Sequence, residues 1–221
     1  MPTYRGIGNL FREWSQAQLM TRLRDQYDIR SVLNAPYDHA TDPEVDNEMF
    51  GRWDAWEILH PSIAPLGVYY DLVWNFDFVQ RYPVLLEDMI LMSNKYVLAF
   101  VPNRYNGGQF MHGIYHRLHG STCTHPEGGN PQLMTKQGLV ALFESVGLHV
   151  LEVDGVDLAP WPDYTVPIGK FFATPNNDVP ISIYEGTPRI PIPKQLLSFE
   201  RLIKPLGWTW AHHLYCLGEK Q

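Results

Sequence analysis

The chain has 221 residues, of which 45% are hydrophobic and 19% charged, with a formal net charge of −7. This length suits one domain with a full core, so we expect residues 1–221 to form a single domain of a soluble globular protein. The acidic balance argues against non-specific binding to nucleic acid, which needs a basic surface.

The sequence also argues against a membrane or secreted protein. No apolar run approaches the roughly 18 residues that cross a bilayer, and the N-terminus lacks the charged and apolar regions of a signal peptide. Cys123 and Cys216 are the only cysteines, which is too few for a disulfide scaffold. We therefore expect a cytoplasmic protein with no membrane partner.

The N-terminal part of the chain begins with a predicted helix. Apolar residues recur at three- and four-residue spacing over residues 10–27. A short strand is expected at residues 29–33, and it must end before Pro36 because proline cannot continue a central strand. Residues 38–67 are rich in acidic residues, and we expect loop there with one short strand or helix near residues 52–59.

The next three elements form the most informative stretch. Two apolar runs rich in aromatic and β-branched residues, 68–76 and 95–101, predict buried strands. Residues 78–92 predict a helix between them, with Pro83 in its first turn. Such a βαβ unit places the residues after its parallel strands on one rim, where α/β proteins bind ligands. The rim residues expected here are Asn75, Asp77, Asn103 and Arg104.

The C-terminal half is expected to contain a helix, a strand, a proline-rich excursion, a second helix and a last strand. These elements cover residues 135–146, 148–153, 155–193, 194–204 and 208–217. Thr135 is suited to cap the first helix, and Gly147 to close it in a left-handed conformation. The excursion contains eight prolines and is too long for an ordinary connection, so it is either a lid or a surface feature.

Three segments in this order match a known pattern. They are Tyr70-Asp-Leu-Val-Trp-Asn-Phe76, the strand at 96–103 that ends in Pro-Asn, and the helix, glycine and strand at 134–148, followed by a terminal strand at 211–220. The set resembles class I S-adenosylmethionine-dependent methyltransferases of the small-molecule type. The resemblance implies an α/β fold with a doubly wound, mostly parallel, Rossmann-like sheet of seven strands, the C-terminal strand being antiparallel. It also implies S-adenosylmethionine as cofactor and a small molecule as substrate.

The resemblance covers most of residues 29–154 and 194–220, but it breaks at the first strand. In the family a glycine-rich turn there lets the backbone approach the cofactor, whereas the matching segment Asn34–Asp38 contains no glycine and includes Pro36 and Tyr37. The segment between Asn34 and Tyr70 is also shorter than the family allows, which suggests that one strand–helix unit is trimmed.

The cofactor-binding residues follow from the resemblance. The family holds the ribose hydroxyls with an acid at the end of the second strand, and Asp54 has the matching spacing, with Glu57 as the alternative. Asn75 and Phe76 would flank the cofactor, although Asn75 and Asp77 have an alternative role as caps of the following helix. The implied set is Asn34, Ala35, Pro36, Asp38, Asp54, Asn75 and Phe76.

Histidines gather in a predicted short helix, residues 109–118, and just beyond it. The cluster comprises His112, His116, His119, Cys123 and His125. On a helix His112 and His116 share a face, where they could bind a divalent metal or act as a general base. The spacing matches no zinc module, so no metal site is assigned. We predict that His112, His116 or Asp77 removes a proton from the methyl acceptor.

The remaining candidates concern the substrate and the last strand. Trp161, between two prolines, is either a rigid pocket wall or an anchor for the excursion. His212 and His213 are expected to face opposite sides of the last strand in core or edge positions. The predicted substrate residues are Asn103, Arg104, Tyr115 and Trp161.

Three functions remain open on the sequence. The first is a small-molecule methyltransferase. The second is a methyltransferase-like protein that has lost its cofactor site and serves as a binding or assembly subunit, which the missing glycines favour. The third is a metal-dependent enzyme that uses the cluster from His112 to His125. The expected partners are a small-molecule substrate and either a second copy of the chain or a partner subunit, without nucleic acid or membrane.

Overall fold

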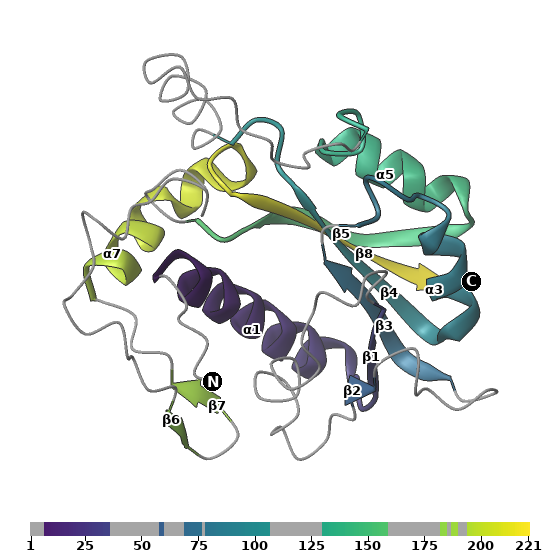
Figure 1. Ribbon diagram of the computed structural model, residues 1–221, viewed down its shortest axis with the longest axis horizontal. Coiled ribbons are helices and arrows are strands. Elements are labelled where there is room, and N and C mark those ends of the chain that lie inside the picture. Colours follow the sequence, from purple (N-terminus) through teal and green to yellow (C-terminus); the bar gives the residue numbers. More distant parts are fainter. Residues whose placement is uncertain are drawn as a thin grey trace, which may run out of the picture.

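The computed structural model describes residues 7–35, 58–59, 69–76, 78–106, 130–158, 182–184, 187–189 and 194–221. These residues form a six-stranded sheet with helices on both faces and a separate two-stranded sheet (Figure 1). In chain order the elements are α1 (Ile7–Tyr27), β1 (Val32–Asn34), β2 (Ile58–Leu59), β3 (Tyr70–Phe76), α3 (Leu85–Met92), β4 (Ser93–Pro102), α5 (Lys136–Ser145), β5 (Leu148–Val156), β6 (Ser182–Tyr184), β7 (Thr187–Arg189), α7 (Lys194–Ile203), the 3₁₀ helix η1 (Lys204–Thr209) and β8 (His213–Lys220).

The large sheet has the strand order β2-β1-β3-β4-β8-β5. Strands β1 to β4 are parallel to one another, and β8 is antiparallel to both of its neighbours, β4 and β5. This confirms the predicted doubly wound, mostly parallel sheet with an antiparallel C-terminal strand. The described residues supply six of the seven strands that the resemblance implied, and β2 falls in the range where a short element was expected.

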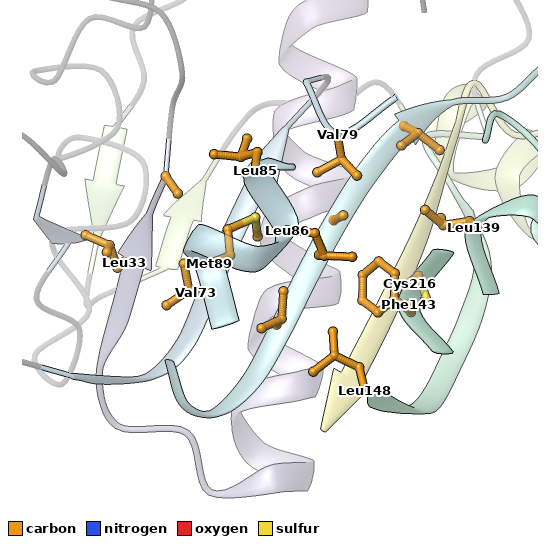
Figure 2. Close-up of a cluster of buried hydrophobic side chains, with 14 of the residues drawn as sticks. Leu33, Val73, Val79, Leu85, Leu86, Met89, Leu139, Phe143, Leu148 and Cys216 are labelled. Carbon is orange, nitrogen blue, oxygen red and sulfur yellow. The ribbon is translucent and has the colours of Figure 1, made fainter. Parts of the chain in front are cut away.

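Alternate residues of the central strands belong to two separate hydrophobic cores, one on each face of the sheet, as the two-residue period of a strand requires. One core lies under α1, where Met20 and Leu23 are fully buried. The other lies under α3 and α5, where Met89 and Phe143 are fully buried (Figure 2). In β4, the residues that face α1 are Tyr96, Leu98 and Phe100, and those that face α3 and α5 are Val97, Ala99 and Val101.

Helix α5 has the predicted ends. Thr135 is extended, and its Oγ1 accepts a hydrogen bond of 3.1 Å from the backbone N–H of Gly138. Gly147 follows the helix with φ of +83°, the left-handed conformation that glycine adopts without strain.

Helix α3 begins later than predicted. Residues 78–84 form turns, in which the backbone N–H groups of Arg81 and Tyr82 both donate to the carbonyl of Phe78. Pro83 therefore precedes the helix instead of lying in its first turn. The physical reason is that proline disfavours helical geometry at the residue before it, so a helix cannot run from residue 78 through Tyr82.

The C-terminal strand also differs from the prediction. It begins at His213 and reaches Lys220, whereas residues 204–209 form the 3₁₀ helix η1 with Gly207 at φ of 53°. Pro205 and this kink prevent an extended conformation at Trp208. Within the excursion, β6 and β7 pair antiparallel. No helix in the described ranges has the length and apolar character needed to cross a membrane.

Candidate functional site

The carboxyl ends of the parallel strands meet at one edge of the sheet. The register pairs Asn34 at the end of β1 with Trp74, and Phe76 at the end of β3 with Phe100. His213 at the start of β8 lies between Pro102 of β4 and Val156 of β5. Six of the sequence-predicted site residues lie at this edge: Asn34, Ala35, Asn75, Phe76, Asn103 and Arg104.

Buried asparagines fix the loops that leave this edge. Asn75 is completely buried; its Nδ2 donates to the carbonyl of Ala35 at 2.6 Å, and its Oδ1 accepts from the N–H of Phe78 at 3.2 Å. The second bond holds the turn that follows β3. It is not the helix cap that was the alternative role for Asn75, because α3 begins at Leu85 and has no side-chain cap. The Nδ2 of Asn103 likewise donates to the carbonyl of Ala211 at 2.8 Å, and its Oδ1 accepts from the N–H of Tyr105. Both side chains therefore hold the backbone of the adjoining loops in place.

The chain after β1 is held where the family has its glycine-rich turn. Ala35 is 1% exposed, and its backbone N–H donates to the carbonyl of Trp74 at 2.8 Å. Its carbonyl accepts from Asn75, so both polar groups of this peptide segment are already bonded. The side chain at this position is small and buried, although it is not a glycine.

Phe76 joins the edge to the N-terminal helix. The guanidinium of Arg12 on α1 lies 5.2 Å from the centre of the Phe76 ring, a cation–π contact. The Phe76 ring centre also lies 4.8 Å from that of His213. A cation, an aromatic ring and an imidazole thus follow one another along the edge.

An Asp–His–His cluster at the same edge was not predicted from the sequence. Asp157, directly after β5, is 4% exposed. Its Oδ2 lies 3.3 Å from Nδ1 of His212 and 3.6 Å from Nδ1 of His213. Burial would raise the pKa of Asp157, but the nearby imidazoles of His212 and His213 outweigh it and hold the pKa below its usual value.

The placement of the two histidines corrects the prediction that they face opposite sides of a strand. His212 precedes β8, because the strand begins one residue later, and both imidazoles approach the same carboxylate. Both side chains are buried, as a core position requires. The adjacent histidines were the only sequence signal for this cluster, and the partner residue lies in a distant segment.

A pocket of about 470 Å³ extends from Asp157 along β5, between α1 and α7. Its described lining comprises Ser15, Gln18, Leu19, Arg22, Glu152, Asp154, Gly155, Val156, Asp157, Leu158, Glu200, Lys204, Gly207 and Tyr215. Ligand pockets in proteins commonly have volumes of about 300–1,000 Å³. None of the sequence-predicted site residues is among the lining residues in the part of the chain that the structure describes.

A charged network forms one wall of this pocket. Arg22 donates to both carboxylate oxygens of Glu152, at 3.0 and 2.7 Å, and the hydroxyls of Tyr27 and Tyr215 donate to the same carboxylate. The hydrogen bond from Arg22, opposed by burial and supported by Tyr27, lowers the pKa of Glu152. Burial, followed by the hydrogen bond to Glu152, raises the pKa of Tyr27 to about 12. Glu152 is therefore charged and its hydrogen-bonding capacity is in use.

Replacing Glu152 by glutamine is expected to lower the free energy of unfolding at pH 7 by about 1 kcal/mol, since Arg22 is half-exposed and solvent weakens the pair. Because the folded pKa of Glu152 lies below its usual value of 4.5, its charge stabilises the fold above that pH and the effect is lost as pH falls through the folded pKa. Urea unfolding at pH 7 and pH 3 measures this. Glu219→Gln, which removes a looser 3.8 Å pair with Lys95, is the control. An equal loss in both variants, or a loss for Glu152→Gln that is as large at pH 3 as at pH 7, would contradict the account.

Several predicted residues lie outside the described residues. The described ranges contain no group of three or more His, Cys, Asp or Glu that could hold a metal ion. β2 ends at Leu59, five residues beyond Asp54 in the sequence. The roles predicted for the following residues therefore stay predictions: Pro36, Asp38, Asp54, Asp77, His112, Tyr115, His116, Trp161 and the cluster that runs to His125.

Comparisons with known proteins bear on the fold. No protein-family model and no curated protein matches the sequence. Magnesium protoporphyrin IX methyltransferase from Synechocystis PCC 6803 with bound SAH is similar in structure, with a TM-score of 0.50 and 6% identity over 97% of this chain and 86% of that chain. The plantazolicin methyltransferase BpumL in complex with SAH gives a TM-score of 0.48 at 9% identity, over 96% and 85% of the two chains. The methyltransferase domain of bacterial CtHen1 gives 0.45 at 8% identity, over 94% and 99%. The first of these similarities shows that the fold is class I methyltransferase-like.

Proposed function

We propose that the protein is an S-adenosylmethionine-dependent methyltransferase that acts on a small molecule. The observation that carries the proposal is the sheet: parallel strands β2, β1, β3 and β4, then antiparallel β8 inserted before β5. In open α/β sheets, ligands bind outside the carboxyl ends of the strands. A fold alone does not determine activity, so the proposal also depends on what this edge offers a cofactor.

The described edge is chemically compatible with an adenosine-bearing ligand. The small side chain of Ala35 is buried after β1, and the ring of Phe76 at the end of β3 is only partly buried. The cofactor would lie across Asn34, Ala35, Asn75 and Phe76, with Asn75 keeping the two loops in register through its bond to Ala35. S-adenosylmethionine, when bound, supplies a methyl group on a positively charged sulfur.

The chain's own task is then to align the methyl acceptor and, where needed, to accept its proton. The predicted bases are His112, His116 and Asp77. Among the described residues His213 is a further candidate, because its Nδ1 lies beside the carboxylate of Asp157 and its ring touches Phe76.

Calorimetric titration with S-adenosylmethionine and with its product S-adenosylhomocysteine (SAH) tests the proposal. We expect saturable 1:1 binding of both. SAH at 100 times its dissociation constant should raise the free energy of unfolding by about 2.7 kcal/mol. The absence of binding heat for both ligands, together with no change in unfolding, in protein that circular dichroism shows to be folded, would refute it.

A second candidate function is a methyltransferase-like binding or assembly subunit without a cofactor. The observation that favours it is Ala35, whose N–H and carbonyl are both bonded within the protein where the family has a glycine-rich turn. Such a protein would bind neither ligand in the titration. The same experiment therefore separates the two candidates.

A further inference from the structure

The pocket beside β5 carries more acidic than basic side chains, and two of its acids are already engaged. Glu152 is bound by Arg22, and Asp154 forms a 2.8 Å ion pair with Lys136. Asp157 and Glu200, from β5's end and α7, are the other two acidic residues of the described lining. The charge that a ligand would meet is therefore set mainly by this pair and by Lys204.

Two buried polar atoms of the lining residues have no hydrogen-bond partner among the described residues. They are Oδ1 of Asp157 and Oγ of Ser15. The other carboxylate oxygen of Asp157 faces the imidazoles of His212 and His213. A buried charged group that lacks a donor is costly, by about 1–3 kcal/mol or more, so the vacant oxygen of Asp157 needs an explanation beyond the fold itself.

Glu200 shows that Asp157 and α7 influence each other across the pocket. Burial raises the pKa of Glu200, Lys204 and Arg201 oppose this, and the negative charge of Asp157 raises it further. A cation placed between the two carboxyl groups would relieve their repulsion. A metal ion is a poor occupant, because the described residues contain no set of three metal ligands.

We propose that this pocket binds a small organic ammonium ion, with its N–H groups donating to Asp157, Ser15 and Glu200. An ammonium group has three donors and no acceptor, which matches three oxygen acceptors lining one pocket. The pocket volume of about 470 Å³ leaves room for an organic body beyond the charged group. The proposal concerns binding in a pocket distinct from the expected cofactor position, and it does not require methyl transfer.

The test uses the full chain and three probes of similar size: butylammonium, 1-butanol and butyrate, titrated by NMR or calorimetry. We expect butylammonium to bind with saturation and about tenfold or more tightly than the other two. Asp157→Asn should weaken its binding about tenfold or more, and Glu200→Gln should weaken it by a smaller factor. Asp154→Asn is the matched control, because it removes a carboxylate charge from the same pocket wall, and Lys136 already neutralises that charge. It should change the affinity less than twofold.

Glu200→Gln keeps the test informative if Asp157→Asn does not fold, since Glu200 is only half-buried on α7. Equal or tighter binding of 1-butanol or butyrate, no saturable binding of butylammonium, or unchanged affinity in both acidic variants would overturn the proposal. Saturating SAH should leave butylammonium binding in place, and full competition would overturn a separate pocket. Failure of SAH to bind bears on the proposed function alone.

Discussion

Replacing Phe143 by alanine is expected to lower the free energy of unfolding by about 3–5 kcal/mol. Phe143 is completely buried on α5, where it packs with Leu148 and Cys216 (Figure 2). Gly218 on β8 leaves room for this ring, because a Cβ added there would lie 2.7 Å from Cδ1 of Phe143. Removing the ring leaves a cavity that the surrounding strands cannot fill, and urea unfolding measures the loss.

Glu144→Ala is the control for this prediction, because Glu144 is the exposed neighbour on the same helix. It should change stability by no more than about 0.5 kcal/mol. A loss below about 1.5 kcal/mol for Phe143→Ala would mean that α5 does not pack on β8 as described.

Replacing Asn75 by alanine is expected to lower the free energy of unfolding by about 2–4 kcal/mol and to break the link between the loops after β1 and β3. The substitution leaves the carbonyl of Ala35 and the N–H of Phe78 without their partner in a buried setting. Under the proposed function, losing the link between the loops after β1 and β3 should also weaken SAH binding by about tenfold, because the cofactor depends on both loops. Urea unfolding measures the loss of stability, and calorimetric titration of the folded variant measures its affinity for SAH.

Asn130→Ala provides a matched comparison, because Asn130 also accepts a backbone hydrogen bond, from Gln132, but is exposed. It should cost less than about 1 kcal/mol and leave SAH affinity unchanged. If the two variants behaved alike in stability, the buried link at Asn75 would not be structurally important. If Asn75→Ala bound SAH as tightly as the wild type, the cofactor would not depend on the loops after β1 and β3.

The sheet could be predicted from the sequence because its strands carry strong local patterns. The alternation of β4 between two cores reflects an apolar run that is buried on both faces. Thr135 and Gly147 mark the two ends of α5, because a threonine cap and a left-handed glycine are local signals in the sequence. The boundaries of α3 and β8 were wrong because Pro83 and Pro205 act on their neighbours more strongly than the apolar spacing suggested.

One part of the candidate site could be predicted from the sequence and another part could not. Asn75 is the last but one residue of β3 and Asn103 directly follows β4, so their place at the edge could be predicted from the strand ends alone. The cluster around Asp157 could not, because it depends on β5 pairing with β8 so that Val156 faces His213. The pocket wall likewise depends on Arg22 and Glu152, which are 130 residues apart in the chain. Contacts of that range leave no periodic signal in one sequence.

A crystal structure of the protein grown with SAH tests the central claim most directly. The account predicts SAH across the carboxyl ends of β1 and β3, beside Phe76, with the link from Asn75 to Ala35 intact. A structure in which SAH is absent and that position is filled by the chain's own Pro36 and Tyr37 would contradict it and favour the cofactor-free candidate.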